Sequence, residues 1–562
     1  WLFGIIWALR GVQKSQHHVP EGPRRNPLSP RKLWASPLLR ILVTVILMFV
    51  AGLLIYDVPI FHSDETLESA YFNHTKMPSQ KLSVGGLSED SARLTYFILD
   101  LALQPLGDWR GFNSLDQFGQ SALRYKLAFM TYALAQVHYL QLPAYPTPFQ
   151  EAIDRLIQRM MQKRVWSYWY FENLWGNWKK NPDPVYEMNV MYSGHLANMI
   201  GLYEWLFNDH KYDEPGSIRL VWDEDTAFEY DHASLVERLY SQMHDNPYHS
   251  IACEPQQVFA MCNDHAALSL MLFDATHNTQ LSDVNHSYIE NLDHLFHGDD
   301  GFFNYPYYYH LDVTLPLHLG VGDGWALALM HPFARQRVRS MYPAFFHRHG
   351  RWQDDSTATV TGHVFEFMDI GDYRLSDASQ VSFGLLLASE VGDTTFAKGL
   401  WRHAVRKYQP INKDGTMYFS RASLLVNSVF LLGRVNQPDG LWRLYNQGWP
   451  TSHFHDPHLK DLNLNQVLVL RADYAPESGL TFVLKPRHQR TTQIEVNITD
   501  LQPDVEYTLR QDSQLVKSFQ TPNGNYTFTA KISDKTQFEV KSNFSISNSK
   551  YQTTLACKKT KI

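Results

Sequence analysis

The chain has 562 residues and a hydrophobic fraction of 44%, which is enough apolar material for a large core and for more than one domain. Its formal net charge is -7 and no basic stripe runs through its body, so nucleic acid is not an expected partner. The aromatic fraction of 14% is typical of a densely packed core and of an apolar or sugar-binding cavity.

The N-terminal residues predict a membrane anchor. Residues 1–40 are rich in Pro, Ser and Arg and are expected to form a disordered, basic, cytosolic segment. Residues 41–61 begin with ILVTVILMFVAGLLIY, a short span that Arg40 can lengthen by snorkelling. Basic residues precede this run and acidic residues follow it, which places the body in the lumen of the secretory pathway, starting at the endoplasmic reticulum. No small-residue cleavage site follows, which favours a single-pass signal anchor over a removed signal peptide.

A luminal body also predicts a glycoprotein. N-x-S/T sequons stand at Asn73, Asn285, Asn497, Asn525 and Asn543. Only three cysteines are present, so disulfides are not expected to build the fold.

Residues 62–450 are dominated by helical periodicity. Apolar residues recur at helical spacing in the segments 91–104, 119–141, 147–163, 186–207, 233–244, 254–274, 286–296, 322–342, 376–391, 395–407 and 419–433. Helices in this number suggest a toroid of helix pairs whose inner helices line a central cavity, although the pattern leaves the number of pairs open.

Residues 451–562 have a different pattern, in which apolar and polar residues alternate and turn residues follow at short intervals. The alternating segments are 466–473, 479–486, 492–499, 506–511, 515–520, 525–530 and 537–542. They predict an all-β sandwich of about seven strands, which we expect to be a packing domain without chemistry of its own.

A helix expected near residues 186–207 carries a candidate catalytic histidine. Met191, Tyr192 and His195 stand three or four residues apart and therefore share one face. A lone histidine on an apolar helix is more often a hydrogen-bonded core residue, and by itself this pattern favours that interpretation.

Two cysteines follow. The string Cys253-Glu254-Pro255 predicts a loop that enters a helix at the proline, which would place Cys253 at the positive end of the helix dipole and favour its thiolate. Because Cys253 and Cys262 are nine residues apart, they can face one cavity only if Cys253 precedes the helix. Two buried structural cysteines, or one disulfide, are the alternatives.

The amino-acid sequence of this region resembles those of the bacterial linalool dehydratase/isomerases and their fungal relatives. The matching strings are KRVW (163–166), DP (183–184), N-x-MY-x-GHL (189–196), GLY (201–203), NP (246–247) and CEP-x3-F-x2-CN (253–263). The last string is specific, because two cysteines, Glu-Pro and a spaced Phe must coincide. The resemblance covers roughly residues 93–445 and implies that residues 62–450 form an (α/α)6 barrel.

The resemblance also implies an active site. The family's catalytic residues fall on Asp100, Tyr125, His195, Cys253 and Cys262. The first three would transfer protons to and from a substrate hydroxyl, and the cysteines would act on the alkene side. Pocket-lining positions fall on Met191 and Phe259, and Tyr192 and Trp166 in the matching strings are expected to bind substrate with them. In the family, the acidic residue at the end of an early helix, which corresponds to Asp100, reaches the cavity of a neighbouring subunit. Asp100 is therefore expected to act in trans in a homo-oligomer.

The resemblance implies a cofactor-independent lyase or isomerase of secondary metabolism. Its substrate would be a small hydrophobic isoprenoid, a terpenoid or meroterpenoid alcohol or alkene that is protonated, dehydrated, isomerised or cyclised in an apolar cavity. Two family tyrosines are replaced near Trp109 and Val321, which favours a larger isoprenoid than linalool. No aspartate-rich metal motif is present, so we expect no metal site and no cofactor.

Three alternatives remain at this point. The first is a terpenoid or polyketide cyclase that does not dehydrate. The second is a luminal (α/α)6 glycoside hydrolase, which needs two carboxylates across its cavity; the candidates are Asp183, Glu254, Glu366 and Asp369. The third is a non-catalytic lipid-binding scaffold.

Overall fold

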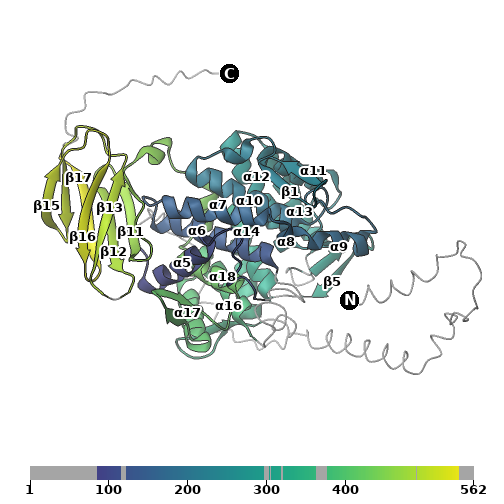
Figure 1. Ribbon diagram of the computed structural model, residues 1–562. Coiled ribbons are helices and arrows are strands. Elements are labelled where there is room, and N and C mark those ends of the chain that lie inside the picture. The colour runs from purple at the N-terminus through teal and green to yellow at the C-terminus, as the bar shows by residue number, and fades with distance from the viewer. Residues whose placement is uncertain are drawn as a thin grey trace, which may run out of the picture. The chain divides into compact units, whose positions relative to one another are not determined.

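The computed structural model describes residues 85–114, 122–296, 303, 305–317, 320–361, 376–488 and 490–543. All of them belong to one compact unit, Pro78–Ile562, whose helices and strands Figure 1 shows. The expected cytosolic segment 1–40, the expected span 41–61 and the sequon at Asn73 lie outside the described residues. Among the helices of the described part, none has both the length and the apolar character needed to cross a membrane.

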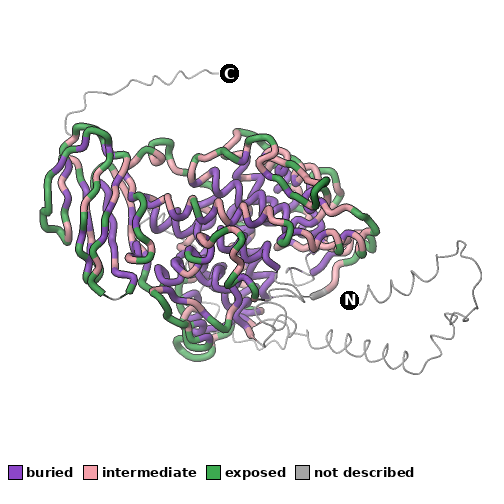
Figure 2. The backbone as a smooth tube through the Cα atoms, viewed as in Figure 1, coloured by how far each residue is buried: buried purple, intermediate pink, exposed green. Residues whose placement is uncertain are grey.

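Six helices form a closed ring at the centre of the helical part. They are α6 (Leu123–Gln141), α10 (Val190–Phe207), α12 (Ala260–His277), α14 (Gly320–His349), α16 (Ala378–Val391) and α18 (Leu424–Val435). Each helix packs against the next in this order, and α18 packs against α6, so the ring is closed. Apolar residues lie on all sides of most of these helices, as expected for helices enclosed on every side, and Figure 2 shows the central backbone as largely buried.

Further helices cover the outside of the ring. They are α5 (Glu89–Ala102), α7 (Thr147–Met160), α8 (Lys163–Trp166), α9 (Tyr168–Asn177), α11 (His232–Asp245), α13 (Val284–Leu295), α17 (Thr394–Tyr408) and α19 (Gly440–Asn446). Helix α7 packs on α6 and α10, and α11 packs on α10 and α12. In α7 the buried side chains include Phe149, Ile153, Leu156 and Ile157, which form the one-sided stripe of an outer helix.

Glycines let α10 and α12 approach closely. A Cβ atom on Gly201 would lie 2.9 Å from Leu272 Cβ, and one on Gly194 would lie 3.2 Å from the backbone nitrogen of Ala266. The close approach at Gly194 matters for function, because the next residue on α10 is His195 and the residue before Ala266 on α12 is His265. The two imidazoles are therefore held together across the helix pair, with ring centroids 3.8 Å apart and an interplanar angle of 44°.

Short strands lie in the connections of the helical part. β1 (Ile218–Val221) pairs with β2 (Ala227–Tyr230), β6 (Gly350–Trp352) with β7 (Ala358–Val360), and β8 (Ile411–Lys413) with β9 (Thr416–Tyr418). A small sheet joins β3 (Gln257–Val258), β4 (Tyr305–Tyr308) and β5 (Val313–Leu317). None of these strands was expected from the sequence, because runs of two to five residues are too short to show a period.

Two antiparallel sheets follow the helices. One has the order β10 (His458–Lys460), β13 (Thr492–Thr499) and β16 (Tyr526–Ile532), and the other has the order β11 (Val467–Ala475), β12 (Gly479–Pro486), β17 (Thr536–Ser542), β14 (Tyr507–Gln511) and β15 (Gln514–Phe519). Phe528 of the first sheet contacts Phe538 of the second, with ring centroids 5.7 Å apart. The expected alternation is present in β13, where Ile494, Val496 and Ile498 are buried.

The described sequons differ in their exposure. Asn525 and Asn543 are exposed, and Asn497 is partly exposed. Asn285 is buried, with 5% of its surface exposed, and its amide nitrogen donates a hydrogen bond to the carbonyl of Ala267 at 3.0 Å. A glycan at Asn285 does not fit the folded chain, because its attachment atom lies in the core.

Candidate functional site

Cys253 lies in a tight turn and not at the start of a helix. The backbone N–H of Gln257 donates to the carbonyl of Glu254 at 3.1 Å, and that of Cys253 donates to the carbonyl of Gln257 at 3.0 Å. Gln256 takes the left-handed conformation, with φ +68°, and α12 begins only at Ala260. The prediction that Pro255 opens a helix was therefore wrong. Cys253 does precede the helix, which is the condition under which both cysteines can face one place.

The two cysteines are buried free thiols that hydrogen-bond to each other. Burial, followed by the hydrogen bond with Cys262, raises the pKa of the Cys253 thiol well above its usual value. Burial also raises the pKa of Cys262, while the hydrogen bond from Cys253 lowers it. The Cys253 thiol also donates to Oε2 of Glu254 at 2.5 Å, so a carboxylate competes with Cys262 for its one proton. The expected Cys253 thiolate was wrong, since no helix dipole acts on it, and the structure contains no disulfide between the pair.

His195 stands at one end of a chain of hydrogen bonds across the ring. The indole N–H of Trp325 on α14 donates to Nε2 of His265 at 3.0 Å. Nδ1 of His265 lies 3.3 Å from the hydroxyl of Tyr132 on α6, and that hydroxyl lies 2.8 Å from Nδ1 of His195. Four helices of the ring, α6, α10, α12 and α14, thus meet through four polar side chains.

The indole of Trp325 can only donate a hydrogen bond, and this fixes the proton positions along the series of hydrogen bonds to His195. Trp325 can only donate, so Nε2 of His265 is an acceptor and its Nδ1 carries the proton. That proton is donated to Tyr132, whose own hydroxyl proton is donated to Nδ1 of His195. The neutral His195 therefore carries its proton on Nε2, and among the described residues this nitrogen has no hydrogen-bond partner. Burial, then His265, holds the pKa of His195 well below its ordinary value, so the imidazole is neutral and offers an N–H.

Aromatic rings surround the histidine pair. Phe129 lies 5.0 Å from Trp325 and 6.0 Å from His195 between ring centroids. Phe383 stacks on Trp325 at 4.9 Å with an interplanar angle of 4°. Such faces stabilise positive charge, and together with the burial of the site they suit a reaction in which a C–O bond breaks towards a cation.

Tyr125 links the histidines to a buried arginine. Its ring centroid lies 5.8 Å from that of His195, and its hydroxyl accepts a hydrogen bond from Nη2 of Arg124 at 3.1 Å. The guanidinium lies over the rings of Tyr125 and Tyr168, at 4.3 and 4.1 Å. Burial raises the pKa of Tyr125 well above its usual value, Arg124 opposes that rise, and Glu254 and Cys262 add to it. Tyr125 is hence a neutral phenol that lies between the histidine and cysteine groups.

The expected substrate-binding residues are placed differently from one another. Met191 is buried on α10, one turn before His195, and Phe259 is the residue before α12 and stacks on Tyr305 at 6.2 Å. The hydroxyl of Tyr192 donates to the carbonyl of Met160 at 3.0 Å, and the indole of Trp166 donates to the carbonyl of Met161 at 3.0 Å. These last two side chains join α10 and α8 to the end of α7 and are not brought to His195.

Asp100 is not brought to the other predicted catalytic residues within one chain. Its side chain is 41% exposed and forms an ion pair with Arg487, which follows β12. Nη1 of Arg487 donates to Oδ1 of Asp100 at 3.2 Å, and the same guanidinium donates to the carbonyls of Leu464 and Asp414. In one chain this carboxylate anchors the strand-rich part to α5.

One carboxylate proposed for a glycosidase has a structural role. Oδ1 of Asp183 accepts the backbone N–H groups of Val185 and Tyr186, and Oδ2 accepts the hydroxyl of Tyr230 at 2.7 Å. Glu254 lies beside Cys253, whereas Glu366 and Asp369 lie outside the described residues.

Sequence reasoning missed Arg124, Tyr132, His265 and Trp325. The last of these stands in the string GWALALMHP. His265 follows Cys262 by three residues and so lies on the same face of α12, which is a signal that spacing alone could have given. Tyr132 shows no such signal, because a tyrosine on a helix that is apolar on all sides looks like any core residue.

Acid is expected to destabilise the fold through buried neutral histidines. Burial lowers the pKa of His138 and His265 to about 3 and that of His195 in the same direction. The unfolded chain, with histidine pKa values near 6.5, binds more protons below that pH. Stability is therefore fully present above pH 6.5 and falls as the pH drops, by up to ~1.4 kcal/mol per pH unit for each histidine.

Urea midpoints between pH 7.5 and 5 measure this slope. His138→Gln, which removes one titrating group outside the candidate site, is expected to show a shallower loss than the wild type, whereas His244→Gln on the surface should match it. If stability fell equally with pH in all three chains, the loss of stability in acid would not come from buried histidines such as His138.

Solved structures with a similar arrangement share little sequence with the chain. A novel alpha-amylase from Clostridium perfringens matches with 10% identity and a TM-score of 0.38, covering 62% of this chain and 97% of its own. A GH76 alpha-mannanase from Bacteroides thetaiotaomicron matches with 11% identity and a TM-score of 0.38, covering 64% of this chain and 96% of its own.

Comparison with sequence families gives a match over more than half of the chain. The model of the family described as linalool dehydratase/isomerase matches residues 124–425. The matched segment begins at Arg124, the residue before Tyr125, and contains His195, both buried cysteines, His265 and Trp325. The strands of the two C-terminal sheets lie beyond it. The chain belongs to the linalool dehydratase/isomerase family.

Proposed function

We propose that the chain is a cofactor-independent lyase or isomerase that acts on an isoprenoid alcohol or alkene. The observation that carries this proposal is a buried group of neutral acids and bases, Tyr125, His195, Cys253 and Cys262, lined by aromatic rings. The ring of six helices is proposed to be the inner layer of an (α/α)6 barrel. Residues 41–61 are proposed to anchor the chain, with residues 1–40 in the cytosol and residues 62–450 and 451–562 in the lumen of the endoplasmic reticulum or a later secretory compartment.

The proposed reaction begins at the substrate hydroxyl. The Nε2–H of His195 and the Tyr125 phenol donate hydrogen bonds to this oxygen and orient it. The Tyr125 phenol transfers its proton to the oxygen and regains one from the Cys262 thiol, which leaves a thiolate; the C–O bond breaks with its electron pair on oxygen, and water leaves. The aromatic rings stabilise the allylic cation that remains.

The cysteine pair then acts on the carbon skeleton. The Cys262 thiolate left by that transfer takes a proton from a neighbouring carbon, which gives an alkene and restores the thiol; Cys253, whose contact lowers the pKa of Cys262, stabilises the thiolate meanwhile. Return of water at another carbon gives the isomeric alcohol. In the reverse sense, protonation of an alkene by a thiol starts a cyclisation without loss of water. These outcomes use the same acid and base groups. The product of dehydration is lighter than its precursor by one water, whereas the products of isomerisation and cyclisation have the mass of the precursor.

The test compares a host that expresses the full-length wild type with hosts that express Cys253→Ala and His195→Ala. We expect an isoprenoid-derived product only with the wild type, lighter than its precursor by one water for a dehydratase and of equal mass for an isomerase or cyclase. Growth in deuterated water should label the product of a protonation-driven cyclisation. If the three hosts have the same isoprenoids while glycans change only with the wild type, the proposal is overturned in favour of a glycoside hydrolase.

A further inference from the structure

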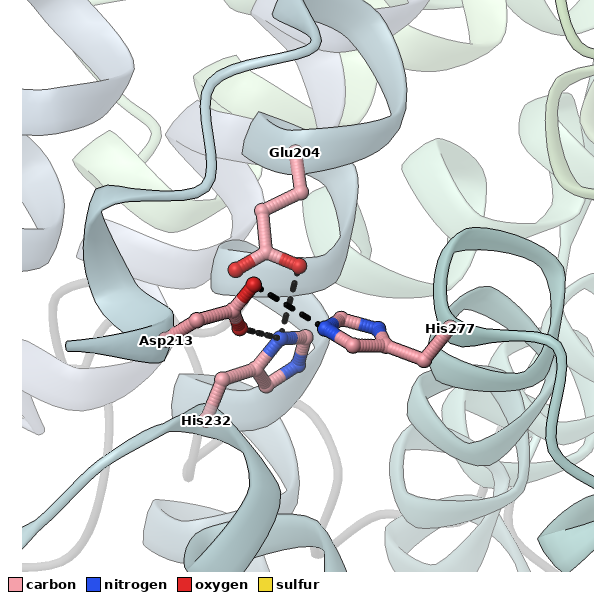
Figure 3. A group of neighbouring side chains, drawn as sticks. All are labelled: Glu204, Asp213, His232 and His277. Carbon is pink, nitrogen blue, oxygen red and sulfur yellow. Dashed lines mark hydrogen bonds and ion pairs between the residues drawn. The ribbon is translucent and has the colours of Figure 1, made fainter. Parts of the chain in front are cut away.

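Four side chains with ligand atoms meet at the ends of helices α10 and α12, away from the cysteine pair. As Figure 3 shows, two carboxylates and two imidazoles converge on one point. They come from the last turn of α10, the short helix η2 (Lys211–Asp213), the first residue of α11 and the last residue of α12: Glu204, Asp213, His232 and His277.

The spacing of these atoms suits a single ion. Nδ1 of His232 lies 2.8 Å from Oε2 of Glu204 and 3.8 Å from Oδ1 of Asp213, and Nε2 of His277 lies 3.0 Å from Oδ2 of Asp213. One ligand atom from each of the four residues lies within 4.8 Å of all the others. Around a tetrahedral zinc ion, metal–ligand bonds of about 2.0–2.1 Å place neighbouring ligand atoms roughly 3.3 Å apart, so small side-chain adjustments suffice.

The site combines a closed interior with an open side. The side chains of Glu204 and His232 are 0% exposed, whereas those of Asp213 and His277 are 32% and 22% exposed. Within the described residues, Oε1 of Glu204 and Oδ1 of Asp213 are buried and accept no hydrogen bond. An ion could therefore enter past the exposed pair and reach carboxylate oxygens that lack a donor.

No fixed positive charge balances the two carboxylates. Among the ion pairs of the described residues, Glu204 and Asp213 pair with histidines alone, including the partly exposed His210, whose Nδ1 lies 3.0 Å from Oδ2 of Asp213.

A second cluster of similar composition shows the contrast. His331, Glu390 and Asp439 also bring ligand atoms together, but Arg335 and Arg339 both form ion pairs with Asp439. In that cluster the two arginines supply the positive charge, so its carboxylates need no bound metal ion. The Glu204 cluster has the same need for positive charge, and no arginine or lysine in the described part of the chain forms an ion pair with Glu204 or Asp213.

We propose that Glu204, Asp213, His232 and His277 bind one divalent transition-metal ion, with zinc as the expected occupant. Imidazole nitrogens and carboxylate oxygens are ligands that zinc takes, whereas magnesium and calcium take oxygen ligands. The role is structural: the ion ties α11 and η2 to the ends of α10 and α12, the two helices that carry His195, Cys262 and His265.

This inference departs from the expectation of no metal site. That expectation came from the absence of a compact motif, and the four ligands are separated by 9, 19 and 45 residues in the sequence, which matches no motif spacing. The inference is independent of the proposed function, since it concerns a site that the proposed reaction does not use.

The test measures zinc binding by the full-length chain after treatment with EDTA. Zinc chloride is titrated, and bound zinc and the thermal midpoint are both recorded. We expect one zinc per wild-type chain and a midpoint that rises with zinc. His277→Ala removes a partly exposed ligand and should weaken zinc binding at least ~100-fold, since loss of even an outer-shell partner costs 10–100-fold.

The matched control is His286→Ala, which removes a surface histidine that pairs with Glu290 at 3.2 Å and is 80% exposed. It should bind zinc as the wild type does. If His277→Ala fails to fold, Asp213→Asn serves in its place, and a cobalt titration of the wild type reports tetrahedral geometry from its absorption spectrum. A wild type that binds no zinc, or a His277→Ala chain that binds it equally well, would overturn the proposal.

Discussion

Replacing His195 by glutamine is expected to lower kcat by roughly 10²–10⁴-fold, the usual contribution of a positioned acid or base. Glutamine can fill the site and form hydrogen bonds in it, but its amide cannot take up or pass on a proton as an imidazole can. The comparison of kcat and KM, with the isoprenoid substrate identified by the metabolite experiment, measures this effect. The substitution should leave KM within a few-fold, because the apolar walls remain.

Two further variants make the result specific. Tyr132→Phe keeps the imidazole but removes the hydroxyl that fixes its tautomer, and it should show a smaller loss of kcat together with a changed pH profile. Tyr192→Phe, also buried on α10, loses a hydrogen bond to the Met160 carbonyl and should keep kcat while losing about 1 kcal/mol of stability. A His195→Gln chain that retains wild-type kcat would show that the histidine is a core residue.

Most of the helices and longer strands of this fold could be predicted, because the segments that show a regular hydrophobic period are long. The segments expected at 147–163, 376–391 and 395–407 correspond to α7, α16 and α17, whose bounds differ by at most three residues. The β-segments at 479–486 and 492–499 coincide with β12 and β13. One helical error came at residues 254–259, where proline chemistry suggested a helix start. The backbone there makes a turn instead, because Cys253 and Gln257 pair with each other.

The candidate site was predictable only in the parts that the family strings contain. His195, Cys253, Cys262 and Tyr125 were named from those strings, and in the structure the Tyr125 ring lies 5.8 Å from that of His195. The proton positions were beyond reach, since they depend on contacts such as Trp325 with His265, which are 60 residues apart. Tyr192 failed for a related reason: it shares a helix with His195, but its hydroxyl reaches Met160 on α7. Sequence spacing gives the face of a helix and not the partner of a side chain.

A buried carboxylate on α16 holds the end of the helical ring together. Glu390 is 0% exposed. Its Oε1 lies 2.7 Å from Nδ1 of His331 and accepts the backbone N–H of Trp442, and its Oε2 accepts the N–H of Leu441 and the amide of Asn436. Helix α19 begins at Gly440, so two of these donors are the unpaired N–H groups of its first turn. A side chain from α16 thereby caps α19 and also contacts α14.

Replacing Glu390 by alanine is expected to lower the free energy of unfolding by about 3–5 kcal/mol, because four buried donors lose their acceptor together. Glu390→Gln keeps the shape but turns an amide towards backbone N–H groups, and it should lose roughly 1–3 kcal/mol. Glu495→Ala, at an exposed position on β13, is the control and should stay within about 0.5 kcal/mol of the wild type. Urea denaturation of the three full-length variants measures the order. If Glu390→Ala unfolds at the wild-type midpoint, the capping of α19 is not a source of stability, and the ring must owe its closure to the apolar contacts of α14, α16 and α18 alone.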